Sequence, residues 1–285
     1  MKGESFSVDT ESAGTLAGLR WGSTRDLPVL ALHGWLDNAA SFAPMAASLS
    51  GVQIFALDLP GHGKSDHRPP GMRYHLMDYV PAVLEAADAL GFTSILIMGH
   101  SLGGAIAGLT AVAAPERVQA MILIEGLGPL SESEAKLPAR LRDSVSGYAR
   151  VHKRTAPVYL DIETLVSSRA RIGPMSNASA RLLIERNVHQ HDDGYRWRSD
   201  PRLRLDSPVF LTEPQVLACL KAIAQPTQVL LGNDGMLSKR ETLGPRLEAL
   251  NSADVRWLDG AHHLHMDHPE AIAAAAADFL SQFSQ

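Results

Sequence analysis

The chain has 285 residues, of which 45% are hydrophobic and 20% are charged, and its formal net charge at pH 7 is −5. This composition excludes a largely disordered chain, and the acidic balance argues against nucleic acid as a partner. The length fits one large domain that carries an inserted subdomain.

Short apolar runs alternate with helical patterns over residues 28–124, and the alternation resumes near residue 226. Each run has the length of a buried strand, and the helical patterns repeat apolar residues every three or four positions. Such alternation predicts an α/β fold whose central sheet is mostly parallel, with helices on both faces and functional residues at the C-terminal ends of the strands. The expected strands are residues 28–32, 53–57, 95–98, 120–124, 227–231 and 255–258, and the expected helices are residues 77–90, 102–114 and 271–280.

The alternation stops between residues 129 and 225. This stretch is rich in arginine, helical in pattern and interrupted by proline and glycine, and it contains no convincing core strand. We therefore predict a core domain formed by residues 1–128 and 226–285, with an inserted helical cap, or lid, over residues 129–225. Such a cap would set the scope of substrates.

Residues 99–103 read Gly-His-Ser-Leu-Gly and match the pattern G-x-S-x-G. A predicted strand enters this segment and a helix of small residues leaves it, so the two glycines permit a strained turn that lifts the serine hydroxyl above the sheet. The N–H groups at the start of that helix favour developing negative charge. Ser101 is therefore the predicted nucleophile, with a chance match in a glycine-rich turn as the alternative.

A His-Gly-Trp sequence follows the strand expected over residues 28–32. An acyl-transfer enzyme needs two N–H donors for its oxyanion, one from the residue after the nucleophile and one from a loop after an earlier strand. Leu102 and Trp35 are the predicted donors, although an ordinary turn at the strand end would give the same sequence. The residues expected to contact substrate are His33, Gly34 and His100.

Four histidines fall within residues 262–268, shortly after the strand expected over residues 255–258. A metal site is one interpretation, but no second cluster of ligands accompanies them, and adjacent residues point in different directions on a regular backbone. One histidine that acts as a general base explains the placement better. We therefore expect neither a metal nor another cofactor.

Together these segments resemble the α/β-hydrolase fold superfamily, in the right order and over nearly the whole chain outside the cap. The segments that carry the resemblance are residues 33–34, 58–65, 99–104 and the histidine block before Pro269 and Glu270. Residues 33–38, 124–129 and 195–201 resemble the serine hydrolase-like proteins within that superfamily. The superfamily pattern implies His262 as the catalytic histidine, seven residues before the proline, with His263 as the alternative.

Two positions remain open for the acid of a catalytic triad. Most relatives place it after the strand that precedes the histidine strand, where residues 232–235 (Gly-Asn-Asp-Gly) put Asp234 one position early. Glu125 ends the strand over residues 120–124, which resembles the position from which some haloalkane dehalogenases supply their acid. Both choices keep the chain order serine, acid, histidine. We predict Glu125, with Asp234 as the alternative.

The resemblance implies a serine hydrolase that cleaves a small-molecule carboxylic ester through an acyl-enzyme. Hydrolysis of a lactone or a carbon–carbon bond is an alternative within the same class, and a catalytically silent receptor for small molecules is an alternative of another class. The expected partners are a small acyl substrate and, at most, a second copy of the chain, which makes it a monomer or a homodimer.

Neither the N-terminus nor the single cysteine indicates export. The N-terminus lacks a basic segment followed by an apolar one, and runs such as residues 121–124 and 272–277 are too short to span a bilayer. Cys219 lies in an apolar helical pattern and forms no internal disulfide, being alone. We therefore expect a cytoplasmic protein that does not insert into a membrane.

Overall fold

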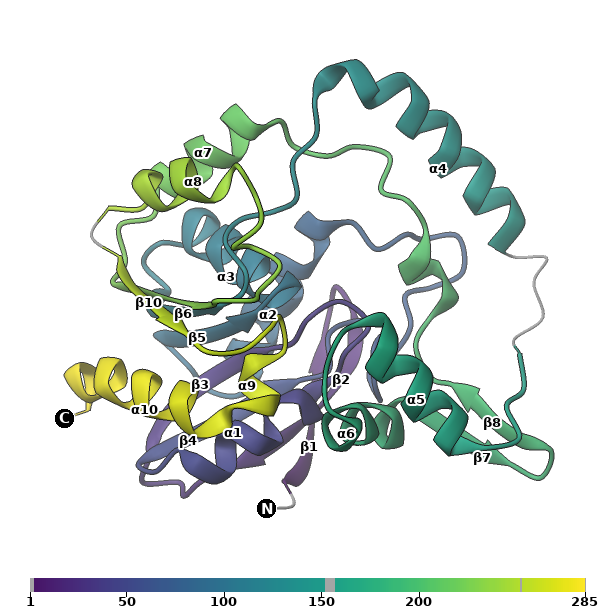
Figure 1. Ribbon diagram of the computed structural model, residues 1–285, viewed down its shortest axis with the longest axis horizontal. Coiled ribbons are helices and arrows are strands. Elements are labelled where there is room, and N and C mark those ends of the chain that lie inside the picture. The colour runs from purple at the N-terminus through teal and green to yellow at the C-terminus, as the bar shows by residue number, and fades with distance from the viewer. Residues whose placement is uncertain (1–2, 152–156, 252, 285) are drawn as a thin grey trace.

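The computed structural model describes residues 3–151, 157–251 and 253–284. Within these residues, eight strands form one sheet that runs through the molecule (Figure 1). The strands are β1 (Glu4–Thr10), β2 (Gly14–Trp21), β3 (Leu27–Leu32), β4 (Val52–Leu57), β5 (Ile95–His100), β6 (Val118–Ile124), β9 (Thr227–Gly232) and β10 (Asp254–Leu258). Their order across the sheet is β1-β2-β4-β3-β5-β6-β9-β10.

The sheet is parallel from β4 to β10, whereas β1 and β2 form an antiparallel hairpin and β2 pairs antiparallel with β4. The predicted α/β fold with a mostly parallel sheet is thereby confirmed. The N-terminal hairpin was not among the expected strands. Its side chains are mostly exposed or half-buried, so its sequence lacks the continuous apolar run that marks a buried strand.

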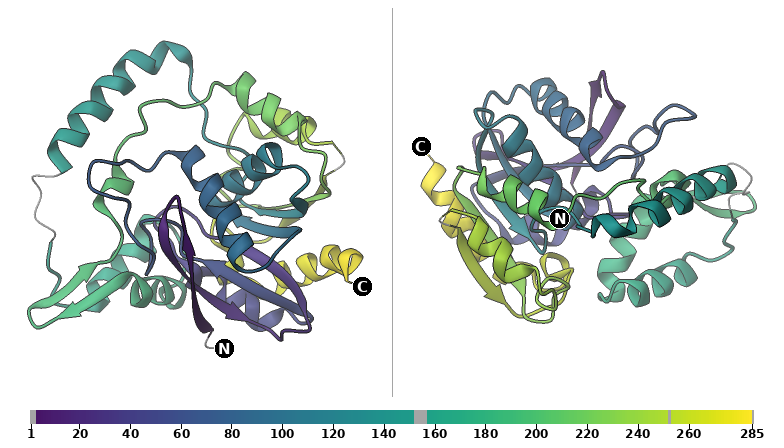
Figure 2. Two further views of the ribbon diagram at one scale, coloured as in Figure 1. Left: turned by 180° about the vertical axis from the view of Figure 1, so that it is seen from behind. Right: turned by 90° about the horizontal axis from the view of Figure 1, so that it is seen from above.

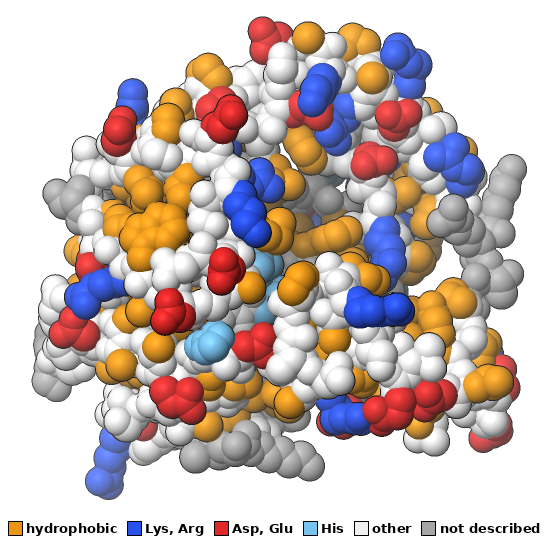
Figure 3. All heavy atoms as spheres, in the orientation of Figure 1, with side chains coloured by type: hydrophobic (Ala, Val, Ile, Leu, Met, Phe, Trp, Pro, Cys, Tyr) orange, Lys and Arg blue, Asp and Glu red, His pale blue; other side chains and the backbone are white. Residues whose placement is uncertain are grey.

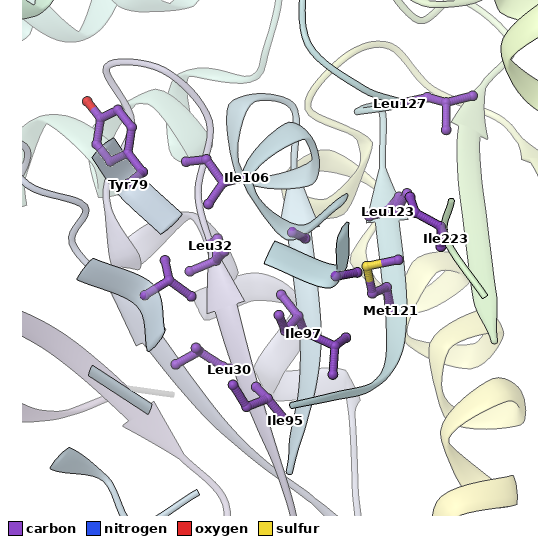
Figure 4. Packing of buried hydrophobic residues seen from close by; sticks show 14 of the residues in the cluster. Leu30, Leu32, Tyr79, Ile95, Ile97, Ile106, Met121, Leu123, Leu127 and Ile223 are labelled. Atoms are coloured by element: carbon purple, nitrogen blue, oxygen red, sulfur yellow. The ribbon is translucent and has the colours of Figure 1, made fainter. Parts of the chain in front are cut away.

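Helices cover both faces of the sheet, and each face has its own apolar cluster. Neighbouring side chains of a strand point to opposite faces, so Leu30 and Leu32 join one cluster while Val29 and Ala31 join the other. Figure 4 shows the first cluster, in which Ile106 of α3 lies over the strands. The helices outside the insert are α1 (Ala43–Ser48), α2 (Tyr79–Ala89), α3 (Leu102–Ala113), α8 (Leu243–Ala249), α9 (Leu264–Asp267) and α10 (Pro269–Leu280).

The segment between β6 and β9 contains helices and, contrary to a purely helical insert, a β-hairpin. Its elements are α4 (Leu137–Val151), α5 (Ile162–Ile172), α6 (Asn177–Asn187), β7 (Val188–His191), β8 (Gly194–Trp197) and α7 (Glu213–Lys221). The hairpin escaped prediction because its strands have four residues each and lie largely at the surface. Val216 and Leu220 of α7 belong to the main core cluster, whereas α4 stands away from the sheet (Figures 1 and 2).

This arrangement places the C-terminal ends of β3, β5, β6 and β9 side by side. The loops that follow these strands carry most of the predicted functional residues. No helix among the described residues is long and apolar enough to cross a membrane.

Candidate active site

Ser101 lies between β5 and α3, where the chain turns sharply. Its φ of 51° and ψ of −110° are sparsely populated backbone angles for a residue with a side chain. A Cβ atom on Gly99 would overlap the backbone of α3, and one on Gly103 would overlap the backbone of Leu32. Glycine is therefore required at both positions, and the strand, tight turn and helix expected around the serine are present.

Backbone strain is concentrated at this edge of the sheet. Among the described residues, the non-glycine residues with positive φ are Leu36 (61°), Ser101 (51°) and Glu125 (47°). They follow β3, β5 and β6, which are adjacent strands. Each such conformation costs on the order of 1–3 kcal/mol and persists only where the surrounding structure enforces it, as at functional sites.

Glu125 reaches from the end of β6 to the histidine block. Its Oε2 lies 3.2 Å from Nδ1 of His262. The carboxylate is only 1% exposed, and it accepts the backbone N–H groups of Gly232 at 2.9 Å and Met236 at 2.8 Å. A Cβ atom on Gly235 would overlap this carboxylate. Gly235 therefore leaves the space that Glu125 fills.

The pKa of Glu125 reflects two opposing effects. Burial raises it, whereas hydrogen bonds from His262 and from the backbone of Gly232 and Leu237 lower it, and the net result is a pKa below the ordinary value of 4.5. The carboxylate is therefore ionised at neutral pH and can only accept hydrogen bonds. This places the proton of the neutral imidazole on Nδ1 and leaves Nε2 of His262 free to take a proton.

Asp234, the alternative acid, is exposed on the turn after β9, and its backbone N–H donates to the carbonyl of Gly260 at 3.0 Å. No ion pair joins it to His262 within the part of the chain that the structure describes, whereas Glu125 makes one at 3.2 Å.

Ser101 is held against the same strand end as Glu125. Its backbone N–H donates to the carbonyl of Ile124 at 3.0 Å, and a Cβ atom on Gly126 would overlap its backbone. His262 also lies close to the serine turn, because its carbonyl is 2.9 Å from Nε2 of His100, the residue before Ser101. The structure thus brings Ser101, Glu125 and His262 to one site.

The loop after β3 lies against the same turn. A Cβ atom on Gly34 would lie 2.8 Å from Nδ1 of His100, so only glycine lets the loop approach this closely. Trp35 follows, with an indole that is half exposed and donates to the carbonyl of Leu203 at 3.0 Å. Leu102 is the first residue of α3, so its N–H has no partner within the helix.

The burial of His33 and His100 corrects the expectation that these side chains contact substrate, since both are 0% exposed. The Nε2 atom of His33 accepts the N–H of Leu59 at 3.0 Å, and its Nδ1 donates to the carbonyl of Gly34 at 2.7 Å. Burial lowers the pKa of both rings, so they are neutral. Their hydrogen bonds to backbone groups hold the loops around the site.

One group of buried side chains has the composition of a metal site. Donor atoms of Asp37, His100 and His263 all lie within 4.8 Å of one another. However, the guanidinium of Arg169 lies 2.6 Å from the Asp37 carboxylate and 3.3 Å from the ring of His263. The positive charge that a metal would supply is already present, so these residues fit an ion pair better than a metal ion.

A hollow opens on the face of the molecule beneath α4, with hydrophobic and Lys or Arg side chains around it (Figure 3). The fold and this site together define an α/β hydrolase. The family model described as alpha/beta hydrolase fold matches residues 28–269, so the chain belongs to that family.

Proteins of similar sequence identify the group within this family. The chain is 30% identical to a serine hydrolase-like protein of Danio rerio, over 94% of this chain and 85% of that protein. It is 31% identical to a probable serine hydrolase of Drosophila melanogaster, over 98% of this chain and 88% of that protein. The chain is thus a member of the serine hydrolase-like group of α/β hydrolases, as its sequence motifs suggested.

Solved structures agree with the α/β-hydrolase fold. A hypothetical protein of Pseudomonas aeruginosa PAO1 matches with a TM-score of 0.89 and 37% identity over 99% of both chains. A thioesterase domain from the curacin biosynthetic pathway matches with a TM-score of 0.80 and 25% identity, over 96% of this chain and 99% of that chain.

Proposed function

We propose that the protein is a serine hydrolase that cleaves a small-molecule carboxylic ester, with Ser101 as nucleophile, His262 as general base and Glu125 as the acid. The observation that carries this proposal is the contact between the buried carboxylate of Glu125 and the partly buried ring of His262, beside a serine in a strained turn. An esterase of Mycobacterium tuberculosis, 27% identical over 93% of this chain and 86% of that protein, supports an ester as the substrate.

In the proposed mechanism, Oγ of Ser101 attacks the ester carbonyl while Nε2 of His262 takes the hydroxyl proton. Glu125 holds the imidazole in the required tautomer and stabilises its charged form. The N–H groups of Leu102 and Trp35 hold the oxyanion. The histidine then gives its proton to the leaving alcohol, and water hydrolyses the acyl-enzyme with the same histidine as base.

We further propose that residues 129–225 act as the cap that selects the substrate. The position of α4 away from the sheet, with only Ser144 of that helix buried, supports this role. A substrate in the hollow beneath α4 would lie between this helix and the loops that carry Ser101 (Figure 3).

Two measurements on the purified wild-type protein test the activity. A fluorophosphonate should label it stoichiometrically at Ser101, and p-nitrophenyl esters of increasing acyl length should release p-nitrophenol, with one length preferred. The variant Ser101→Ala is the control and should do neither. If the wild-type protein binds ligands but neither reacts with the probe nor turns over any ester, it is a receptor with a hydrolase fold.

A further inference from the structure

An arginine of the inserted segment reaches into the core behind the proposed catalytic histidine. Arg169 of α5 pairs with Asp37, which lies two positions after Trp35, and Nη2 of the arginine is 2.6 Å from Oδ1 of the carboxylate. The two side chains are 16% and 1% exposed, so water screens the pair little. Removal of one partner would leave the other charge buried and uncompensated.

The second oxygen of Asp37 faces the sequence neighbours of both reacting residues. Oδ2 lies 3.4 Å from Nε2 of His263, which follows His262, and 3.7 Å from Nδ1 of His100, which precedes Ser101. His100 in turn donates from Nε2 to the carbonyl of His262, because a carbonyl can only accept. The carbonyl of His262 is thus bonded to His100, and the ring of its neighbour His263 lies against both Arg169 and Asp37.

We propose that Asp37 and Arg169 are positioning residues for His262, and this inference rests on the proposed function. Arg169 fixes the carboxylate of Asp37 and donates to Nε2 of His263 at 3.3 Å, so the pair holds the residue that follows His262. The inserted segment is therefore connected to the catalytic base through a series of contacts, and loss of the arginine loosens the base without removing it.

The chain offers a matched control for this inference. Arg186 of α6 also ties the insert to the core, since its Nη2 lies 2.8 Å from Oδ2 of Asp58, with side chains that are 7% and 0% exposed. The other partners of this carboxylate are the backbone N–H groups of Ala39 and Lys64. Among the described histidines, none bonds to this carboxylate. The Arg186–Asp58 pair therefore separates the anchoring of the insert from the positioning of the base.

The experiment compares Arg169→Met, Arg169→Lys and Arg186→Met by kcat, KM and thermal unfolding, with the p-nitrophenyl ester that the wild-type protein cleaves fastest. In Arg169→Met, kcat and the rate of fluorophosphonate labelling should fall by on the order of tenfold to a hundredfold, the effect of a small misplacement, while KM changes little. Arg169→Lys should recover part of kcat because it keeps the charge but not the planar fork. Arg186→Met should lower the melting temperature and keep kcat.

Equal losses of kcat in Arg169→Met and Arg186→Met, or a loss that affects KM alone, would overturn the inference. If Arg169→Met does not fold, the double variant Asp37→Asn with Arg169→Met removes both buried charges, should fold, and should show the same loss of kcat. A wild-type protein that does not react with the fluorophosphonate refutes the proposed function itself. A reactive wild type with an equally reactive Arg169→Met variant refutes only the positioning.

Discussion

Glu125 occupies a place that suits a buried anion. A carboxylate that is 1% exposed would be costly without partners, and this one receives the backbone N–H groups of Gly232, Met236 and Leu237 besides the imidazole. The backbone donors come from β9 and the turn after it, so the proposed acid is oriented by a strand other than its own. Its orientation follows from the fold rather than from neighbouring residues in the chain.

The choice between the two acids is directly testable. Glu125→Gln should lower kcat by on the order of 10³ to 10⁴, because an amide can hold the imidazole in the wrong tautomer. Asp234→Asn should retain nearly all of the activity, because this side chain is exposed on a turn. The test is to measure the steady-state rates of both variants on the same ester, with circular dichroism to check that they fold. If Asp234→Asn loses more activity than Glu125→Gln, Asp234 is the catalytic acid.

Local sequence could predict the serine turn, the histidine and the strand that ends in Glu125, since each depends on residues that are adjacent in the chain. It could not predict the pair of Arg169 and Asp37, which are 132 positions apart. It also assigned His33 and His100 to substrate binding, because proximity to a motif does not reveal whether a ring faces a cavity or the protein interior. Their burial depends on the way β3 and β5 pack together.

At the scale of elements, the first turn of α3 approaches β3 so closely that their backbones come together at Gly103. Gly103 has no room for a Cβ atom beside the carbonyl of Leu32. Gly103→Ala should therefore destabilise the protein by about 1–3 kcal/mol or more, because two regular elements would have to separate. Gly244→Ala in α8 is the matched control, since nothing lies within 4 Å of the added atom, and its stability should stay equal or rise slightly. Chemical denaturation of both variants tests this, and similar losses would contradict it.

The burial of each strand explains whether it could be predicted from the sequence. Strands β3, β4, β5 and β9 are buried on both faces, so they read as continuous apolar runs. The hairpins β1–β2 and β7–β8 are largely at the surface and give only a weak alternation. The predicted sheet was therefore right at its centre and incomplete at its edge.

For the whole molecule, an unusual feature is the number of histidines in the interior. Among the described residues, four histidines are 0% exposed, namely His33, His62, His100 and His265. Burial is the main cause of the lowered pKa of each ring, and the pKa of His62 and of His265 falls to about 3. The folded protein therefore keeps these rings neutral at a pH where the unfolded chain, with an ordinary pKa of 6.5, takes up protons.

This difference fixes the sign of the pH dependence. A histidine whose pKa is lowered in the folded protein does not affect stability above about pH 6.5. As the pH falls from there toward the pKa of the folded state, the free energy of unfolding decreases, because the unfolded chain binds the proton more strongly. Four such rings lower the free energy of unfolding by up to about 5 kcal/mol per pH unit. A stability of roughly 5–15 kcal/mol would be lost within a few pH units, so we expect the loss of stability to begin before most carboxylates are protonated.

One ring isolates this effect. Neither ring nitrogen of His265 has a hydrogen-bond partner among the described residues, and the ring packs on His100 at 4.1 Å and on Phe42 at 5.6 Å between centroids. His265→Phe should therefore retain the stability of the wild-type protein near pH 8, because no hydrogen bond is lost. Between pH 6 and pH 5 its free energy of unfolding should fall less steeply, by about 1 kcal/mol per pH unit.

The measurement is denaturant unfolding of the wild-type protein and the variant at pH values from 5 to 8. His191→Gln is the control, because this ring is exposed and its replacement should leave the slope unchanged. An equal slope in His265→Phe and the wild-type protein would mean that His265 already carries a proton in the folded state. A variant that is more stable than the wild-type protein at pH 5 and equally stable at pH 8 would show that this ring limits the acid stability of the fold.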